Sequence, residues 1–380
     1  MARSVYIHIP FCQHICPYCD FNKYVLKGQP VWHYLEALVQ EMNLTFEQHP
    51  PQEIRTIFVG GGTPTALNPE QMRFFLEAVA RYVQPQAPCV EFTVEANPGT
   101  VNEDLLQVMK EGGVNRLSFG VQSFDRGLLK KLGRIHTTED VHQSLALARK
   151  QGFNNLSIDL MFGLPGQSVD MFREDVEQAL KLDVPHLSAY SLKIEPGTHF
   201  HRLHEQNKFH LPPEDEEATM YELLIKRMTE SGYAHYEISN FAYTGYESRH
   251  NLTYWRNEEY YGLGAGAHGY VQGVRHVNAG PVHEYIEKVA REGLPRVEVH
   301  PVSKQEAMED MMIMGLRTKE GVSRLVFRER YGLKLEDHFG RQLDQLQAKG
   351  LITTDGERYW LTEKGLFLGN EVFAAFIGMH

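Results

Sequence analysis

The sequence has little cysteine, no excess of positive charge and no long apolar run. Only four of its 380 residues are cysteine, which disfavours a disulfide framework and favours a reducing cytoplasm. No apolar stretch approaches the ~20 residues that span a bilayer. Met1–Ser4 leads directly into the first predicted strand, so no signal peptide is expected. Acidic residues outnumber basic ones by 49 to 38, and this balance argues against a nucleic-acid partner.

The remaining composition is that of an ordinary globular protein. Hydrophobic residues make up 42% of the chain and charged residues 23%. The length favours about two or three domains, or one large barrel with an appendage. Internal repeats and low-complexity tracts are absent from the sequence.

Three of the four cysteines lie in one stretch, Cys12-Gln-His-Ile-Cys16-Pro-Tyr-Cys19. This spacing puts three thiols on a tight loop, where they can converge on a single point. A four-iron cluster usually has four cysteine ligands, so this loop would leave one iron without a cysteine and open to a ligand. A zinc site that includes His14 is a weaker alternative, and a disulfide with a spare thiol is weaker still. The isolated Cys89 is expected to be structural.

The first half of the chain alternates short apolar runs with amphipathic helical stretches. The predicted strands are Val5–Ile9, Thr56–Val59, Glu91–Glu95, Arg116–Gly120, Asn155–Met161 and His186–Leu192. The predicted helices are His33–Gln48, Glu70–Tyr82, Glu103–Glu111, Thr138–Gln151 and Val169–Leu182. This alternation indicates an α/β fold with parallel strands and external helices. Periodicity does not separate an open sheet from a barrel, but both place functional residues at the carboxyl ends of the strands.

After Leu192 the alternation stops. A helix is predicted over Pro213–Gly232, then a strand over Tyr236–Phe241 and an aromatic, glycine-rich region to about Tyr270. The last segment predicts helices at Gln305–Arg317, Leu325–Tyr331 and Leu335–Lys349, then a hairpin from Leu351–Thr353 to Tyr359–Thr362. Such an α+β module resembles a winged helix, but its balanced charge favours packing or partner docking over DNA binding. The predicted division is 1–195, 196–300 and 301–380.

A glycine-rich turn, Gly60-Gly-Gly-Thr-Pro64, directly follows the second strand. Glycines allow a backbone to approach a ligand closely, because no Cβ intervenes and unusual φ values cost little. A tight turn between strand and helix is the alternative. The pattern matches neither a dinucleotide-binding site nor a P-loop.

Four polar residues lie at or near the ends of the next strands: Glu95, Gln122, Arg134 and Asp159. Together they suit a zwitterion that bears a carboxylate, an ammonium and a ribose. Arginine binds a carboxylate with two bonds, and acids accept hydrogen bonds from ammonium and hydroxyl groups. For Glu95 the alternative is a salt bridge inside the barrel.

The motif His250-Asn-Leu-Thr-Tyr-Trp255 sets a histidine beside two aromatic residues. Such surroundings suit a flat ligand, and histidine is a common axial ligand of haem iron. A histidine whose hydrogen bonds are satisfied in the core is the alternative.

The cysteine spacing, followed by Asp20-Phe21, resembles the cluster loop of radical S-adenosylmethionine (SAM) proteins. Tyr6–Phe11 and Asp20–Asn22 resemble the branch that contains oxygen-independent coproporphyrinogen III oxidase and the haem chaperone HemW. The resemblance implies a partial (β/α)6 barrel of the TIM type and bound SAM. It also implies a 4Fe–4S cluster with one non-cysteine iron, held by Cys12, Cys16 and Cys19. By matching positions it implies SAM contacts from Tyr6, Tyr18, Gly61, Gly62, Thr63, Glu95, Gln122, Arg134 and Asp159.

Three features favour the chaperone branch over the oxidase branch. The oxidases carry a further cysteine two residues after the last cluster ligand, where this chain has Phe21. They also have a long N-terminal extension, whereas the first predicted strand here begins close to Met1. The third feature is the motif that begins at His250, which is characteristic of the chaperone branch.

The expectation is therefore a cytoplasmic haem chaperone that binds a cluster, SAM and haem, with His250 as the haem ligand. It would deliver haem to haem-requiring proteins such as respiratory enzymes. The alternative is the oxidase reaction, the oxidative decarboxylation of two propionates of coproporphyrinogen III. The sequence leaves open whether SAM is cleaved, whether the chain forms a dimer, and whether it contacts a membrane.

Overall fold

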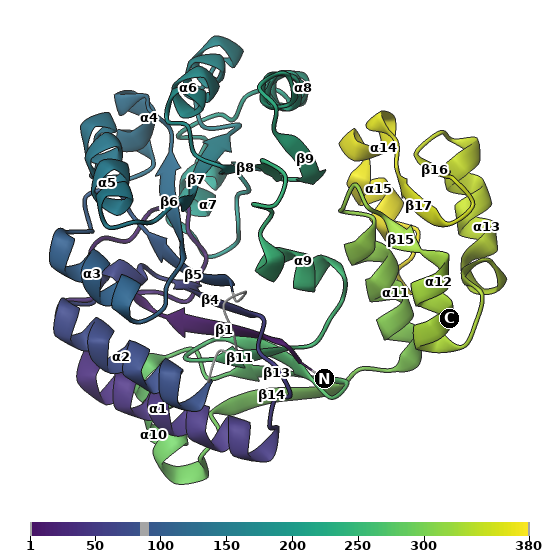
Figure 1. The fold of residues 1–380 in the computed structure, drawn as a ribbon. Helices are drawn as coiled ribbons and strands as arrows, with labels where there is room; N and C mark the ends of the chain where they lie inside the picture. The colour runs from purple at the N-terminus through teal and green to yellow at the C-terminus, as the bar shows by residue number, and fades with distance from the viewer. Residues whose placement is uncertain (1, 84–90, 379–380) are drawn as a thin grey trace.

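The computed structural model describes residues 2–83 and 91–378. Its first half contains six parallel strands with helices on the outside (Figure 1). The strands pair in the order β1 (Ser4–Ile9), β4 (Thr56–Gly61), β5 (Glu91–Ala96), β6 (Arg116–Gln122), β7 (Asn155–Phe162) and β8 (His186–Ser191). The helices are α1 (Val31–Gln48), α2 (Pro69–Tyr82), α3 (Glu103–Glu111), α4 (Arg126–Lys131), α5 (Thr138–Lys150) and α6 (Val169–Lys181). The predicted alternation of strand and helix is confirmed.

The six strands form a partial barrel, because the first and the last of them do not pair with each other. Instead β1 pairs with β11 (Tyr260–Leu263), and β8 pairs with β10 (Asn240–Ala242). The partial barrel that the resemblance implied is therefore confirmed. Parallel strands bring all six carboxyl ends to one edge, where the segments that follow them meet.

Short strands from later in the chain lengthen the sheet at both edges. Beyond β11 lie β12 (His268–Val271), β13 (Val274–Asn278) and β14 (Arg296–Pro301), and beyond β10 lies β9 (Ala234–Glu237). The prediction of one strand over Tyr236–Phe241 is wrong, because a turn at Ile238 and Ser239 separates the antiparallel strands β9 and β10. Helix α10 (Val282–Glu292) packs against α1 beside this extension (Figure 1). The predicted long helix is confirmed as α8 (Glu214–Glu230), which follows the short α7 (His199–Glu205).

Local chemistry explains where several helices begin. Asn68 and Gln71 form a capping box at the start of α2, and Thr137 and Asp140 form another at α5. The strands between the helices are largely buried on both faces, which is why their sequences are nearly continuous apolar runs. One apolar cluster joins the barrel to its extension, and each fully buried large side chain in it contributes about 1.5–3 kcal/mol.

Helix α9 (Arg249–Trp255) lies at the amino ends of the strands, opposite the edge where their carboxyl ends meet. The Oγ1 atom of Thr253 is 2.9 Å from Oγ of Ser4, the first residue of β1. The backbone N–H groups of Arg249 and His250 donate to the carboxylate of Glu91, the first residue of β5, at 2.9 and 3.0 Å. These bonds satisfy N–H groups of the first turn, so the helix is attached to the barrel by its own amino end.

The C-terminal module has its own apolar core. Its helices are α11 (Lys304–Gly315), α12 (Arg324–Tyr331), α13 (Leu335–Ala348), α14 (Glu363–Phe367) and α15 (Gly369–Ala374). Its three-stranded sheet consists of β15 (Val322–Ser323), β17 (Arg358–Leu361) and β16 (Ile352–Thr354). The three predicted helices and the hairpin are confirmed. No helix in the part of the chain that the structure describes combines the length and apolar character needed to cross a membrane.

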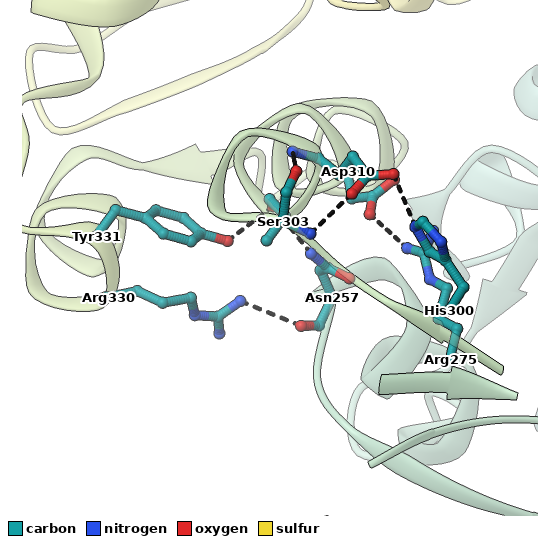
Figure 2. A network of polar contacts seen from close by, with 9 residues as sticks. Asn257, Arg275, His300, Ser303, Asp310, Arg330 and Tyr331 are labelled. Atoms are coloured by element: carbon teal, nitrogen blue, oxygen red, sulfur yellow. Dashed lines mark hydrogen bonds and ion pairs between the residues drawn. The ribbon is translucent and has the colours of Figure 1, made fainter. Parts of the chain in front are cut away.

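Polar contacts attach this module to the lengthened sheet, as Figure 2 shows. Asp310 of α11 pairs with Arg275 of β13, and Asn257 Nδ2 donates to the carbonyl oxygen of Ala307 at 3.1 Å. Arg330 of α12 donates to the carbonyl oxygen of Asn257 at 3.2 Å. Because these groups are partly exposed, the ion pair and each hydrogen bond contribute about 1 kcal/mol or less. Several modest bonds, rather than one strong one, set the position of the module.

Candidate functional site

The three clustered cysteines lie on a loop that follows the carboxyl end of β1. Two short parallel strands, β2 (Phe11–Cys12) and β3 (Tyr24–Val25), close this loop at its base. Cys12 is the second residue of β2 and is buried, whereas Cys16 and Cys19, farther along the loop, are half-buried. The loop is therefore fixed at its base and presents two thiols toward the surrounding space. Cys89, expected to be structural, lies outside the described residues.

Two of the thiols have a polar partner from another element. The hydroxyl of Thr63 donates to Sγ of Cys12 at 3.7 Å, and the guanidinium of Arg134 donates to Sγ of Cys16 at 3.6 Å. Burial raises the pKa of Cys12 and raises that of Cys19 to about 11, and the neighbouring thiols add to both shifts. A thiol with a raised pKa becomes a thiolate only when a cation such as a metal binds it. These surroundings suit metal ligands better than a reactive free thiol.

The donors of this loop fit an iron–sulfur cluster. Within residues 2–83 and 91–378, no three His, Cys, Asp or Glu side chains are placed to hold one metal ion together. The convergence of the three thiols on a single point, expected from their spacing, is therefore not found. A four-iron cluster has a different requirement, since its cysteine thiolates bind separate irons. Three thiols on one fixed loop, with Thr63 and Arg134 beside two of them, meet that requirement.

The glycine-rich turn lies directly against the cysteine loop. Gly61 has a φ of +107°, and a Cβ there would come within 2.4 Å of the imidazole of His8. A Cβ at Gly62 would lie 2.7 Å from the carbonyl oxygen of Phe11. The N–H of Gly61 donates to Oε2 of Glu95 at 3.2 Å. The packing of the chain itself therefore requires both glycines, and a role in SAM binding stays a prediction.

Glu95 and Asp159 are two half-buried acids that face the interior of the barrel. Burial first, and then the charge of Asp159, raises the pKa of Glu95 to about 7. Burial also raises the pKa of Asp159, which accepts a hydrogen bond from Ser118 at 3.3 Å. Among the described residues neither acid forms an ion pair within 4 Å, so the salt bridge considered for Glu95 is absent there. Two adjacent acids with raised pKa values are suited to receive a cationic group.

Arg134 joins the end of β6 to the cysteine loop. Its Nη2 donates to the carbonyl oxygen of Gly120 at 2.6 Å, and its Nη1 donates to Cys16. Its Nε is buried and has no hydrogen-bond partner among the described residues. Gln122 ends β6 with a φ of +68°, where the pairing register with β7 shifts. An unpaired buried N–H on Arg134 is a donor still available to an anionic ligand.

The two predicted aromatic residues lie on different sides of the cysteine loop. The hydroxyl of Tyr6 donates to Nδ1 of His8 at 2.9 Å, because Nε2 of this histidine donates to the carbonyl oxygen of Asn22 at 2.7 Å. The ring of Tyr18 lies 6.2 Å from that of Phe200, on α7. Tyr6 therefore fixes the base of the loop, and Tyr18 packs its outer part.

The structure brings most of the predicted residues to one edge of the barrel. A cavity of about 180 Å³ there is lined by Cys16, Thr63, Arg134 and Asn97, among others. Asn97 was not among the site residues predicted from the sequence. In the structure, Nδ2 of its side chain donates to Oγ1 of Thr63 at 2.8 Å. The Asn-Pro pair that follows Glu95 was the available signal, since it marks the turn at the end of β5.

His250 lies apart from this group, at the amino ends of the strands. Its Nδ1 is 2.9 Å from Oγ1 of Thr56, and its Nε2 is 2.8 Å from the hydroxyl of Tyr254. The imidazole is fully buried and stacks on Phe58, with 5.2 Å between the ring centroids. Burial lowers its pKa to about 3. Both ring nitrogens are therefore already bonded in this arrangement, one to Tyr254 of the same motif and the other to Thr56, which the local sequence did not reveal.

Two family models match the chain. The radical SAM superfamily model matches residues 6–179, and the HemN C-terminal domain model matches residues 302–368. The first match covers the partial barrel as far as α6, and the second covers the C-terminal module as far as α14.

Curated relatives match almost the whole chain. The haem chaperone HemW of Bacillus subtilis is 50% identical over 99% of each chain, and that of Escherichia coli is 36% identical over 98% of each. The mitochondrial radical S-adenosyl methionine domain-containing protein 1 of Mus musculus is 35% identical over 93% of this chain and 82% of its own. Among solved structures, coproporphyrinogen III oxidase (HemN) of Escherichia coli aligns with a TM-score of 0.85 at 24% identity, over 99% of this chain and 90% of its own. This last likeness supports the fold.

Proposed function

Since the chain belongs to the radical SAM superfamily and, within it, to the family of HemW haem chaperones, we propose that it binds haem and delivers it to haem-requiring proteins. The observation that carries this proposal is the 50% identity to a haem chaperone over 99% of both chains. Phe21, at the position where the oxidases have a further cysteine, agrees with it. Respiratory enzymes are the clients we expect, and the low cysteine content is consistent with a cytoplasmic location.

Membership in the radical SAM superfamily implies a 4Fe–4S cluster and SAM. We propose that Cys12, Cys16 and Cys19 hold the cluster and leave one iron without a cysteine. Together these groups supply one-electron chemistry when bound. The protein residues contribute charge and position: Arg134 donates to one thiol and keeps an unpaired N–H, and the half-buried Asp159 interacts with its charge.

We propose that SAM binds at the carboxyl edge of the barrel. Glu95 and Asp159 are suited to its ammonium and hydroxyl groups, and Arg134 is suited to its carboxylate. Tyr6, Tyr18, Gly61, Gly62, Thr63 and Gln122 complete the proposed set. Support comes from the raised pKa values of the two acids, which a cationic ligand would lower again.

Ligation of haem by His250 stays a prediction, and it now carries a condition. Because both ring nitrogens are hydrogen-bonded and the residue is fully buried, α9 must move away from the barrel before the imidazole can bind iron. The proposed domains remain residues 1–195, 196–300 and 301–380. The separate apolar core of the last segment supports its boundary.

Transfer of haem from the cluster-reconstituted protein tests the proposal. Loaded protein is mixed with an apoprotein of a haem enzyme, and the activity of the acceptor is measured against free haem at the same concentration. Faster or more complete activation than free haem gives is the expected result. Failure of the protein to retain haem through gel filtration contradicts the proposal.

The oxidase reaction is the second candidate, favoured by the fold shared with coproporphyrinogen III oxidase. The same protein preparation, given coproporphyrinogen III, SAM and a reductant, distinguishes the two functions. Formation of protoporphyrinogen over many turnovers would replace the chaperone proposal. Haem transfer without this turnover supports it.

A further inference from the structure

A second and larger cavity lies beside the cysteine loop. Its volume is about 580 Å³, within the range of small-molecule sites. Three segments line it: part of the cysteine loop from His14 to Lys23, the end of α4 with the turn at Gly133, and residues 197–203 around the start of α7. It adjoins the smaller cavity at the strand ends, because His14, Cys16 and Gly133 line both, but Thr63, Asn97 and Arg134 line only the smaller one.

The charge of this cavity is entirely positive. Lys23, Lys130, Lys131 and Arg202 line it, and no acidic side chain does so in the described part of the chain. This is unusual in a protein whose formal charge is −11. Lys23 and Lys131 donate to carbonyl oxygens of the chain, whereas Lys130 and Arg202 form no side-chain hydrogen bond or ion pair with the described residues. Two cations are therefore available to the carboxylates of a ligand.

The same cavity presents apolar surface and two imidazoles. Ile15 is 38% exposed, and Phe200 and Leu203 contribute further apolar wall. His14, on the loop, and His199, on α7, line the cavity, and both are exposed. In the described structure neither imidazole has a hydrogen-bond partner. They differ in this from His250, whose two ring nitrogens are both hydrogen-bonded. Because histidine is the commonest metal ligand among side chains, these free ring nitrogens are available to bind a metal.

The walls are joined to one another in advance of any ligand. The N–H of Phe200 donates to the carbonyl oxygen of Pro17 at 3.0 Å, which links α7 to the loop. Pro17 packs so closely on Gly133 that a Cβ there would meet it at 2.7 Å. Beneath the cavity, Phe200 belongs to a small buried cluster with Leu128 and Leu132 of the α4 segment. A cavity with fixed walls loses less entropy when it binds a rigid ligand.

We propose that this cavity is where haem docks. Haem is a flat apolar ring with two carboxylates and an iron that accepts imidazole, and the cavity offers a counterpart to each of these features. The carboxylates meet Lys130 and Arg202, and the iron meets His14 and His199. In this docked state these two imidazoles take the place of His250, which lies at the opposite end of the strands. The inference rests on the proposed function, since it assigns a site to the cargo of a haem chaperone. Because Cys16 and Cys19 line the same cavity, haem would lie beside the cluster loop.

Haem titration of the cluster-reconstituted full-length protein tests this assignment. The double variant Lys130→Ala/Arg202→Ala is expected to bind haem about tenfold more weakly, a loss of about 1.4 kcal/mol. The double variant His14→Ala/His199→Ala is expected to change the Soret spectrum, since it removes the iron ligands. His204→Ala is the matched control, because this imidazole lies on α7, is exposed, and does not line the cavity.

The outcomes separate this proposal from the one on which it rests. If the unmodified protein binds no haem, the proposed function fails. If it binds haem and both double variants match it in affinity and spectrum, the docking site is wrong and the proposed function stands. If the lysine and arginine variant loses only reduction of the cluster by an acidic electron-transfer protein, the cavity is a protein-docking surface and the haem assignment is overturned. Circular dichroism and thermal unfolding of each variant verify that the fold is intact.

Discussion

The hydroxyl of Thr56 lies 2.9 Å from Nδ1 of His250, although 194 residues separate the two in the chain. Thr56 is the first residue of β4, and His250 lies in the first turn of α9. With Tyr254 at 2.8 Å from the other ring nitrogen, the imidazole is held between the helix and the barrel. The histidine of this motif therefore stabilises the fold at the end of the barrel that is remote from the cysteines.

Replacing His250 with alanine is expected to lower the free energy of unfolding by about 2–4 kcal/mol. The change leaves a cavity beside Phe58 and removes hydrogen bonds from the buried hydroxyl of Thr56 and the half-buried one of Tyr254. Urea denaturation measures this loss. The exposed His204→Ala change is the control and is expected to alter stability by about 0.5 kcal/mol or less. Equal stabilities of the two variants would show that His250 has no structural role.

The stabilising effect of His250 is also expected to depend on pH. Its pKa is about 3 in the folded state, below the ordinary value of about 6.5 that it regains on unfolding. Between these values the unfolded chain binds more protons, so this residue's contribution decreases as the pH falls, by up to ~1.4 kcal/mol per unit. The difference between the unmodified protein and His250→Ala should therefore narrow from pH 7 to pH 5. A difference independent of pH contradicts the burial of a neutral imidazole.

Gly61→Ala is expected to destabilise the protein by about 3 kcal/mol or more. Alanine would have to adopt a φ of +107° and would place its Cβ 2.4 Å from the ring of His8, which is held by two hydrogen bonds. Gly113→Ala separates the two causes, because Gly113 has a φ of +88° with no atom within 4 Å of the added Cβ. The control should lose only about 1–2 kcal/mol in thermal or urea unfolding. Similar losses would mean that the His8 contact is easily relieved.

Much of the barrel was predictable because its strands are buried on both faces. Runs such as Val5–Ile9 are apolar except for His8, and the helices between them carry clear capping residues such as Asn68 and Thr137. The strands of the extension lack this signal. β11 and β12 are only four residues long and each contains a glycine, and Val297 and Val299 of β14 are exposed. Pairing of β11 with β1 joins residues 256 positions apart, which no local pattern reveals.

The same distinction applies to the candidate site. Cysteine spacing is a local feature, so the loop was found from the sequence. The partners that decide how residues behave are remote: Arg134 beside Cys16, and Thr56 beside His250. Sequence left two readings of His250 open, and its environment depends on contacts between segments that only the folded chain brings together.

Replacing Cys12, Cys16 or Cys19 with alanine is expected to abolish stable cluster binding. Each thiol is proposed to bind a separate iron, and the unmodified protein already has one iron without a cysteine. Iron and sulfide analysis after reconstitution should give about four irons per chain for the unmodified protein and close to none for each variant. Cys89→Ala is the control and should retain the full content. Retention of the cluster in the Cys12 variant would contradict the proposed ligand set.

SAM binding is expected to weaken as the pH falls below about 7, because the ligand's ammonium needs Glu95 as a carboxylate. Burial and Asp159 raise the pKa of Glu95 to about 7, so about nine-tenths of it is protonated at pH 6 and about one-tenth at pH 8. Titration calorimetry of the reconstituted protein should therefore give an affinity about tenfold lower at pH 6 than at pH 8. Glu95→Gln keeps the shape of the side chain without its titration, so its affinity should be low and nearly constant over this range. Glu103→Gln, on the exposed start of α3, is the control and should reproduce the unmodified profile. A steep profile that persists in Glu95→Gln would assign the titration to another group and remove Glu95 from the proposed SAM site.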